Sequence, residues 1–252
     1  MTVLKALRAH LPSEDFLYLG DTARLPYGTK GPDTVSRYAV QAAGHLVERG
    51  IKLLVVACNT ASAVAMPALI AEFAPLPVMG VVEAGAEAAV AASKNGHIAV
   101  LATESTVNGG AYERAILARR ADSRVYSQAC SLFVALAEEG WVQGPLVKSV
   151  VKEYLYPLLR EKRREGLDCL VLGCTHFPLL KDTIADVAGP EVRLVDSGET
   201  VAVAVERMLP GRKAGRGSAR YLATDGAERF ARVGSLFLGE PIEAHDVEIV
   251  DL

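Results

Sequence analysis

The sequence has few cysteines, and none of them is spaced as in a metal or redox motif. The four thiols are Cys58, Cys130, Cys169 and Cys174. Residues 1–10 mix polar and apolar side chains and lack the apolar core of a secretory signal. Without a disulfide framework or a secretion signal, we expect a reduced cytoplasmic protein whose thiols are free for chemistry.

An excess of positive charge is also lacking. The chain carries 27 Lys and Arg against 30 Asp and Glu, for a net charge of −3. This balance predicts no nucleic acid and no membrane surface as partner, while a small anion can still be held by local N–H groups and hydroxyls. The long apolar stretch Leu53–Ala71 is interrupted by Asn59, Thr60, Ser62 and Pro67. It is therefore predicted to be a buried strand, a polar turn and a helix, not a membrane span.

Short β-branched runs alternate with alanine-rich amphipathic stretches along most of the 252 residues. Apolar runs without polar alternation indicate parallel strands covered on both faces, so the predicted fold class is α/β. The expected strands are Phe16–Gly20, Leu53–Ala57, Val78–Val82, Ile98–Ala102, Cys169–Gly173, Val192–Val195, Tyr221–Ala223 and Glu248–Val250. The expected helices are Asp33–Arg49, Gly85–Ser93, Gly110–Arg120, Pro145–Gly166 and Thr200–Met208, with loops at Pro75–Pro77 and Pro210–Ser218.

An internal repeat is the most informative feature of the sequence. Residues Gly50–Thr60 align without a gap on Gly166–His176, at an offset of 116 residues. Each copy is followed by a second expected strand that ends in an acid and then a glycine, in Val82–Gly85 and Val195–Gly198. The second acid, in Asp196-Ser-Gly-Glu199, has the spacing of a helix N-cap.

The repeat places Cys58 and Cys174 at the carboxyl ends of equivalent strands. Ligands of open α/β sheets bind outside those strand ends. We therefore predict two similar parallel-sheet α/β domains with the active site in the cleft between them. The first domain would comprise residues 1–92 plus 207–252, and the second residues 93–206.

The two cysteines suit an inversion at carbon, which needs a base on one face and an acid on the other. A thiol has a pKa near 8.5, and a following helix N-terminus is expected to lower it. Asn59-Thr60 follow Cys58 and Thr175-His176 follow Cys174, so both thiols have donors for a carboxylate beside them. His176 is placed to take or return the proton of Cys174.

Two other interpretations stand beside this one. A single cysteine at a strand end is more often a small buried hydrophobic residue than a catalyst, but the strand, spacing and polar tail that Cys58 and Cys174 share favour chemistry for the pair. Cys130 and Cys169 are predicted to be packing residues, since Cys169 lies inside a strand run without a polar tail. A zinc site would use Cys58, Cys174 and His176 as ligands. However, Cys174 and His176 are only two residues apart and no further Cys or His lies near either motif, so we predict no metal.

Several short segments, spread over nearly the whole chain, carry a family resemblance. In this order they resemble the bacterial glutamate racemases of the cofactor-independent aspartate/glutamate racemase superfamily. The segments are Gly20-Asp21 with Pro26-Tyr27-Gly28, Ala57–Thr60, Leu101–Thr103 with Thr106, Ser131–Trp141, and Gly173–Pro178.

The resemblance implies a role for each matching residue. Cys58 would take the α-proton from D-glutamate and Cys174 from L-glutamate, with His176 assisting Cys174. Glu138 matches a polar assistant near the substrate amino group, with neighbouring Glu139 as the alternative. The residues that match substrate-binding positions are Tyr27, Gly28, Asn59, Thr60, Thr106, Thr175 and His176.

The resemblance also implies an activity. It predicts a cytoplasmic isomerase that interconverts L- and D-glutamate and supplies D-glutamate for peptidoglycan, with no pyridoxal phosphate, metal or nucleotide. The expected partner is a small-molecule substrate, and a homodimer is the expected assembly. The alternatives are an aspartate racemase or related superfamily member, and a catalytically silent glutamate-binding protein.

One departure from the family motivates the silent alternative. The family has a strand and an Asp-Ser-Gly-Val-Gly-Gly loop directly before a Thr-Val-Leu-Lys-Ala-Leu segment, which here starts at Thr2. The loop's Asp, which assists the first cysteine, and its Ser, which contacts substrate, have no counterpart in this sequence. We therefore expect the strands that would flank such a strand to have open edges, and this chain to have weak activity as written.

Overall fold

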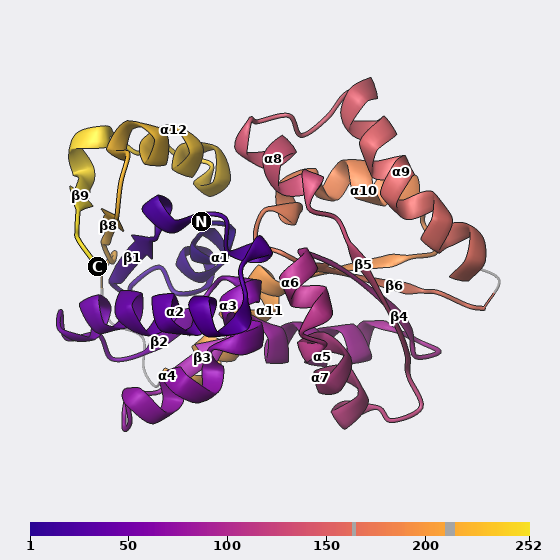
Figure 1. Cartoon of the computed structure of the whole chain (residues 1–252), viewed down its shortest axis with the longest axis horizontal. Helices are drawn as coiled ribbons and strands as arrows, with labels where there is room; N and C mark the ends of the chain where they lie inside the picture. Colours follow the sequence, from indigo (N-terminus) through magenta and orange to yellow (C-terminus); the bar gives the residue numbers. More distant parts are fainter. Residues whose placement is uncertain (163–164, 210–214) are drawn as a thin grey trace.

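The computed structural model describes residues 1–162, 165–209 and 215–252, whose elements form two lobes (Figure 1). All of the strand pairs are parallel. The first lobe contains two small sheets, and the second lobe contains one four-stranded sheet. The α/β class and the two-lobed parallel-sheet arrangement predicted from the sequence are confirmed.

The second lobe is built on a sheet of order β5-β4-β6-β7. Its strands are β4 (His97–Ala102), β5 (Arg124–Ala129), β6 (Cys169–Gly173) and β7 (Arg193–Asp196). Ala99 and Leu101 of β4 face one core, which includes residues of α8 (Leu132–Glu138), α9 (Pro145–Lys162) and α10 (Lys181–Ala188). Ile98 and Val100 face the other core, with α5 (Val81–Ala92) and α7 (Ala111–Arg119). Helices therefore cover both faces, which is why β4 reads as a continuous apolar run.

The first lobe has the sheets β1-β8-β9 and β2-β3. Its strands are β1 (Phe16–Gly20), β2 (Leu54–Val56), β3 (Val78–Gly80), β8 (Ala219–Ala223) and β9 (Val247–Ile249). One face of β2 packs against residues of α2 (Pro32–Val47), α3 (Asn59–Val64) and α4 (Met66–Glu72). The other face packs against α1 (Thr2–His10) and α11 (Ser197–Met208). The last helix, α12 (Ala227–Leu238), shares a core with β8 and β9.

The facing edges of β1 and β2 are open. In the part of the chain that the structure describes, no ladder joins these two strands. Between them lies a groove of about 570 Å³, lined by apolar side chains that include Leu7, Phe16, Leu53 and Val55. The open strand edges expected from the family comparison are therefore observed, and they face one another across this groove.

The repeat extends beyond the cysteine motifs. Strand β3 ends at Gly80 and β7 ends at Asp196, while α5 and α11 begin at the next residue, Val81 and Ser197. Both pairs keep the offset of 116 residues found between the cysteines. The prediction that the second strand of the first copy ends in an acid is wrong. Glu83 lies inside α5, and its carboxylate pairs with Arg119 at 2.7 Å.

Helices α5 and α11 link the two lobes. Helix α5 follows β3 of the first lobe but packs on β6, β7 and α7 of the second. Helix α11 follows β7 of the second lobe but packs on α1 of the first, and α5 and α11 also contact each other. The division into residues 1–92 plus 207–252 and 93–206 stays a prediction.

None of the helices within the described ranges is both long and apolar enough to cross a membrane.

Most expected strands are present within a residue or two of the predicted bounds. One strand was missed: β5, Arg-Val-Tyr-Ser-Gln-Ala, lies at a sheet edge and has the polar, partly exposed side chains typical of that position. The helical onset at Val81 was also placed too late, because Val78–Val82 reads as one β-branched run. Of the expected loop Pro210–Ser218, residues 210–214 lie outside the described residues.

Asp196 is the N-cap of α11, as the sequence predicts, and its carboxylate accepts a hydrogen bond from the N–H of Gly198 at 2.7 Å. We expect Asp196→Ala to lower the free energy of unfolding by about 1 kcal/mol, because an orphan helix N–H loses its acceptor. Burial raises the pKa of this carboxyl. Asp196→Asn keeps the acceptor oxygen without a buried charge, and should be at least as stable as the parent. Urea denaturation of the three proteins tests this; an unchanged midpoint for the alanine variant would contradict it.

Candidate active site

Cys58 and Cys174 lie at equivalent ends of two parallel strands. Cys58 follows β2 and is the N-cap residue of α3. Cys174 follows β6 directly, and its carbonyl accepts a hydrogen bond from the N–H of Phe177 at 3.1 Å. Cys58 is half-buried and Cys174 is 7% exposed. The two thiols are close enough that charge on Cys58 raises the pKa of Cys174.

Burial controls the protonation of both thiols. It raises the pKa of Cys58, and hydrogen bonds from the N–H groups of Ala61 and Thr60 offset only part of that effect. It also raises the pKa of Cys174 to about 12. The lowered thiol pKa expected from the following turns is therefore wrong, because the loss of hydration outweighs the helix N–H groups. A thiol in this site is neutral near pH 7 and needs a proton acceptor to become a base.

His176 is placed to be that acceptor for Cys174. The imidazole Nδ1 lies 3.6 Å from the Cys174 sulfur, and Nε2 lies 3.1 Å from Oε1 of Glu138. The hydrogen bond with His176 holds the pKa of Glu138 below its usual range, so Glu138 is a carboxylate that only accepts. In a neutral ring, Nε2 then carries the proton and Nδ1 presents a lone pair to the thiol. Glu138, and not the exposed Glu139, makes this contact.

Three buried threonine hydroxyls meet beside Cys58. The oxygens of Thr60, Thr103 and Thr106 lie 3.0 to 3.1 Å apart in each pair. Thr60 belongs to α3, whereas Thr103 is the residue before α6 (Glu104–Asn108), which contains Thr106. Gly28 packs over this cluster, since a Cβ there would lie 2.7 Å from the Cβ of Thr103. Thr103 was not among the predicted site residues, although it directly follows β4 as Cys174 follows β6.

Asn59 has a buried amide donor that none of the described residues accepts from. Its side-chain oxygen accepts a hydrogen bond of 2.6 Å from the hydroxyl of Tyr112. Asn59 is 3% exposed, and in the part of the chain that the structure describes its Nδ2 has no hydrogen-bond acceptor. Buried donors are nearly always satisfied, so an unpaired one beside two thiols indicates a place for a ligand acceptor. Tyr112 was missed because nothing near it in the sequence resembles a site.

The remaining predicted substrate contacts, Tyr27 and Thr175, form hydrogen bonds with other residues of the protein. The Tyr27 hydroxyl donates to Asp21, whose carboxylate also accepts from Arg24 and Thr224. The carbonyl of Thr175 accepts a hydrogen bond of 2.7 Å from the hydroxyl of Thr2. Burial and the hydrogen bond to Asp21 raise the pKa of Tyr27, and charge on Cys58 raises it further. The Tyr27 ring therefore lies near the Cys58 thiol.

The structure also bears on the two other cysteines and on the zinc alternative. Cys130 and Cys169 are fully buried in the two cores of the second lobe, as expected for packing residues. Among the described residues, no group of three or more His, Cys, Asp or Glu side chains is arranged to hold a metal ion.

The fold and its paired thiols are those of an α/β amino-acid racemase. The chain belongs to the Asp/Glu/Hydantoin racemase family, whose sequence profile matches residues 2–205. The family resemblance drawn from the sequence is thereby confirmed.

Relatives cover nearly the whole chain. Glutamate racemase of Geobacter metallireducens is 47% identical over 95% of this chain and 88% of its own length. The crystal structure of glutamate racemase from Francisella tularensis in complex with D-glutamate has a TM-score of 0.88 at 34% identity, covering 99% of this chain and 92% of that one. The Thermus thermophilus glutamate racemase in complex with β-chloro-D-alanine has a TM-score of 0.85 at 42% identity, covering 100% and 92%.

The raised pKa of Cys174 can be tested by alkylation of the free protein. Because the thiolate reacts, iodoacetamide labelling of Cys174 should be slow near pH 7 and rise about tenfold per pH unit to at least about pH 9.5. Peptide mass spectrometry gives the rate at this position, and glutathione is the control, with a rate that levels off near an ordinary thiol pKa. A Cys174 rate that levels off together with glutathione would show that burial does not raise this pKa.

Proposed function

We propose that this chain is a glutamate racemase that interconverts L- and D-glutamate by proton transfer between two cysteines. The observation that carries the proposal is the pairing of Cys58 and Cys174, each at a strand end, from lobes related by an internal repeat. Glutamate is the proposed substrate because the relatives of high coverage are glutamate racemases, one of them solved with D-glutamate bound.

From L-glutamate, the reaction begins at Cys174. His176 Nδ1 takes the thiol proton, with Glu138 stabilising the imidazolium through Nε2. The thiolate then removes the α-proton, and the electron pair is delocalised into the substrate carboxylate. Cys58 donates its proton to the opposite face, which releases D-glutamate and leaves Cys58 as the thiolate. From D-glutamate the roles of the two cysteines are exchanged.

The surrounding polar groups would hold the substrate. We assign the free amide N–H of Asn59 and the threonine hydroxyl cluster of Thr60, Thr103 and Thr106 to its carboxylates, since these are buried, pre-positioned donors. The other residues proposed to contact substrate are Tyr27, Gly28, Thr175 and His176. No step of this mechanism uses a cofactor.

We also propose the physiological setting that the sequence suggests. The chain would act in the cytoplasm as a homodimer and supply D-glutamate for peptidoglycan. Its two domains would be residues 1–92 plus 207–252 and residues 93–206, with the substrate between them.

The decisive test is circular dichroism of enantiopure glutamate incubated with the protein, with aspartate as control. Loss of the signal from both L- and D-glutamate is expected. Turnover of aspartate alone would favour the aspartate racemase alternative. Glutamate binding without any loss of signal would favour the silent binding protein.

Each thiol should be indispensable. Because each supplies the proton transfer on one face, Cys58→Ala and Cys174→Ala should each lower racemisation by about 10²–10⁴-fold or more. Cys130→Ala is the matched control, since Cys130 is buried in the core behind Cys174 and is assigned no chemistry. Near-parental turnover of either active-site variant in both directions would exclude a two-cysteine mechanism.

A second comparison separates thiol chemistry from metal chemistry. Treatment with a chelator should leave turnover unchanged, whereas a thiol alkylator should remove it and glutamate should protect. Stoichiometric zinc in the purified protein, lost together with activity on chelation, would support the zinc alternative.

A further inference from the structure

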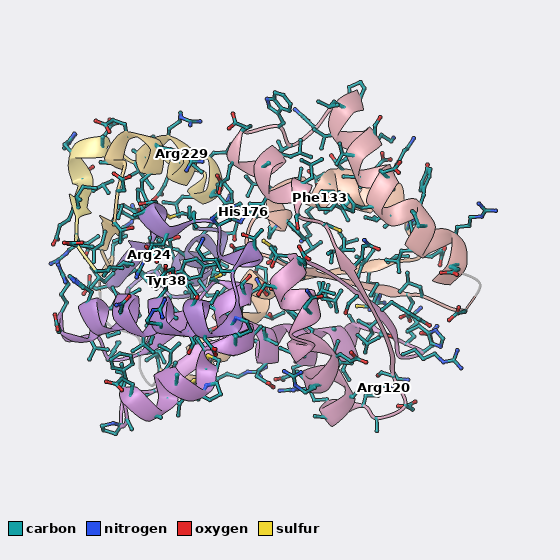
Figure 2. The ribbon with its side chains drawn as sticks, in the orientation of Figure 1. Arg24, Tyr38, Arg120, Phe133, His176 and Arg229 are labelled. Carbon is teal, nitrogen blue, oxygen red and sulfur yellow. The ribbon has the colours of Figure 1, made fainter. Side chains whose placement is uncertain are left out.

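We propose that Arg229 of α12 is a positioning residue that orients His176 through Glu138. This inference rests on the proposed racemase function, and it adds a residue to which no role has been assigned. Figure 2 shows Arg229 on α12 and His176 near the junction of the two lobes.

The two oxygens of Glu138 are engaged by different partners. Arg229 Nη2 donates to Oε2 at 2.6 Å, while Oε1 lies 3.1 Å from His176 Nε2. A carboxylate held at both oxygens cannot rotate about its terminal bond without losing a contact. Arg229 therefore fixes the plane of Glu138, and Glu138 in turn fixes the plane of the imidazole whose Nδ1 faces the Cys174 sulfur.

The contact joins the two lobes. Arg229 belongs to α12, which packs in a first-lobe core through Phe230, Ala231 and Leu238. Glu138 ends α8 and His176 follows β6, both in the second lobe. The proton acceptor of one lobe is thus oriented from the other.

A second side chain of α12 supports the same ring. Phe237 is 6% exposed, and its ring meets His176 edge-on with centroids 5.1 Å apart and an interplanar angle of 84°. The imidazole is therefore held by Phe237 on its ring and by Arg229 through Glu138. Two independent contacts from one helix favour a positioning role over an incidental surface ion pair.

Arg229 acts through Glu138 and His176 on Cys174 and not on Cys58. Its loss should therefore slow proton removal only on the face of the substrate that Cys174 attacks. Racemisation rates cannot show this, because a racemase has an equilibrium constant of one and loses kcat/KM equally in both directions. The rate of chloride elimination from 3-chloroglutamate can show the difference between the two faces. The base removes the α-proton, the electron pair forms the Cα=Cβ bond and chloride leaves; the enamine then tautomerises and is hydrolysed to 2-oxoglutarate and ammonium. Each α-configuration reports on one cysteine.

The experiment compares Arg229→Gln, Arg229→Lys and the parent protein on both configurations. We expect Arg229→Gln to slow elimination from the L compound by about tenfold and to leave the D compound within about twofold, as for other residues that orient a histidine through a hydrogen bond. Arg229→Lys should recover part of the loss, since an ammonium still donates to Glu138. Arg232→Gln is the matched control: Arg232 is an exposed cation one turn along α12 and is not an ion-pair partner of Glu138.

A double-mutant cycle completes the test. If Arg229 acts through Glu138, adding Arg229→Gln to Glu138→Gln should slow elimination from the L compound no further. Equal losses on both configurations, a loss confined to the D compound, or no loss at all would each overturn the assignment. These outcomes differ from failure of the proposed function, in which the parent protein itself would not racemise glutamate.

Discussion

The packing of α5 against α11 is the constraint on which the site depends. Each helix leaves the strand next to a cysteine-bearing strand and crosses to the opposite lobe, where it covers part of that lobe's core. The carboxyl ends of β2 and β6 are therefore held toward each other, and neither lobe can complete its core without the other. Two thiols far apart in the sequence become neighbours as a consequence of burying apolar helix faces.

The same burial that brings the thiols together keeps them protonated near pH 7. Removing a thiolate from water raises its pKa, and the local N–H groups recover only part of this. The two halves respond differently. Cys174 has His176 and Glu138 beside it, whereas in the described part of the chain the groups that lower the pKa of Cys58 are chiefly the N–H groups and hydroxyl of its own helix. The repeat is symmetric in its backbone but not in its proton chemistry.

The sequence allowed prediction of what is local or repeated, and not of what depends on three-dimensional packing. The cysteine motifs and the cap at Asp196 are encoded within a few residues and were found. Thr103, Tyr112 and Arg229 approach the site from other elements, and single positions of this kind carry no pattern. The direction in which the thiol pKa values shift also depends on packing. The motifs indicate the helix N–H groups that lower these pKa values, but not the loss of hydration that raises them.

Several polar contacts around the site join the two lobes. Thr60 of the first lobe bonds to Thr103 and Thr106 of the second, Thr2 donates to the carbonyl of Thr175, and Arg229 holds Glu138. These contacts surround the thiols, whereas the apolar packing of α5 and α11 supports them from behind. A relative shift of the lobes would separate the hydroxyl cluster and release Glu138 together. In the proposed mechanism, the hydroxyls that would bind the substrate carboxylates and the imidazole that would accept the Cys174 proton therefore depend on the same lobe arrangement. A substrate that bridges the lobes would thus also orient the proton acceptor of Cys174.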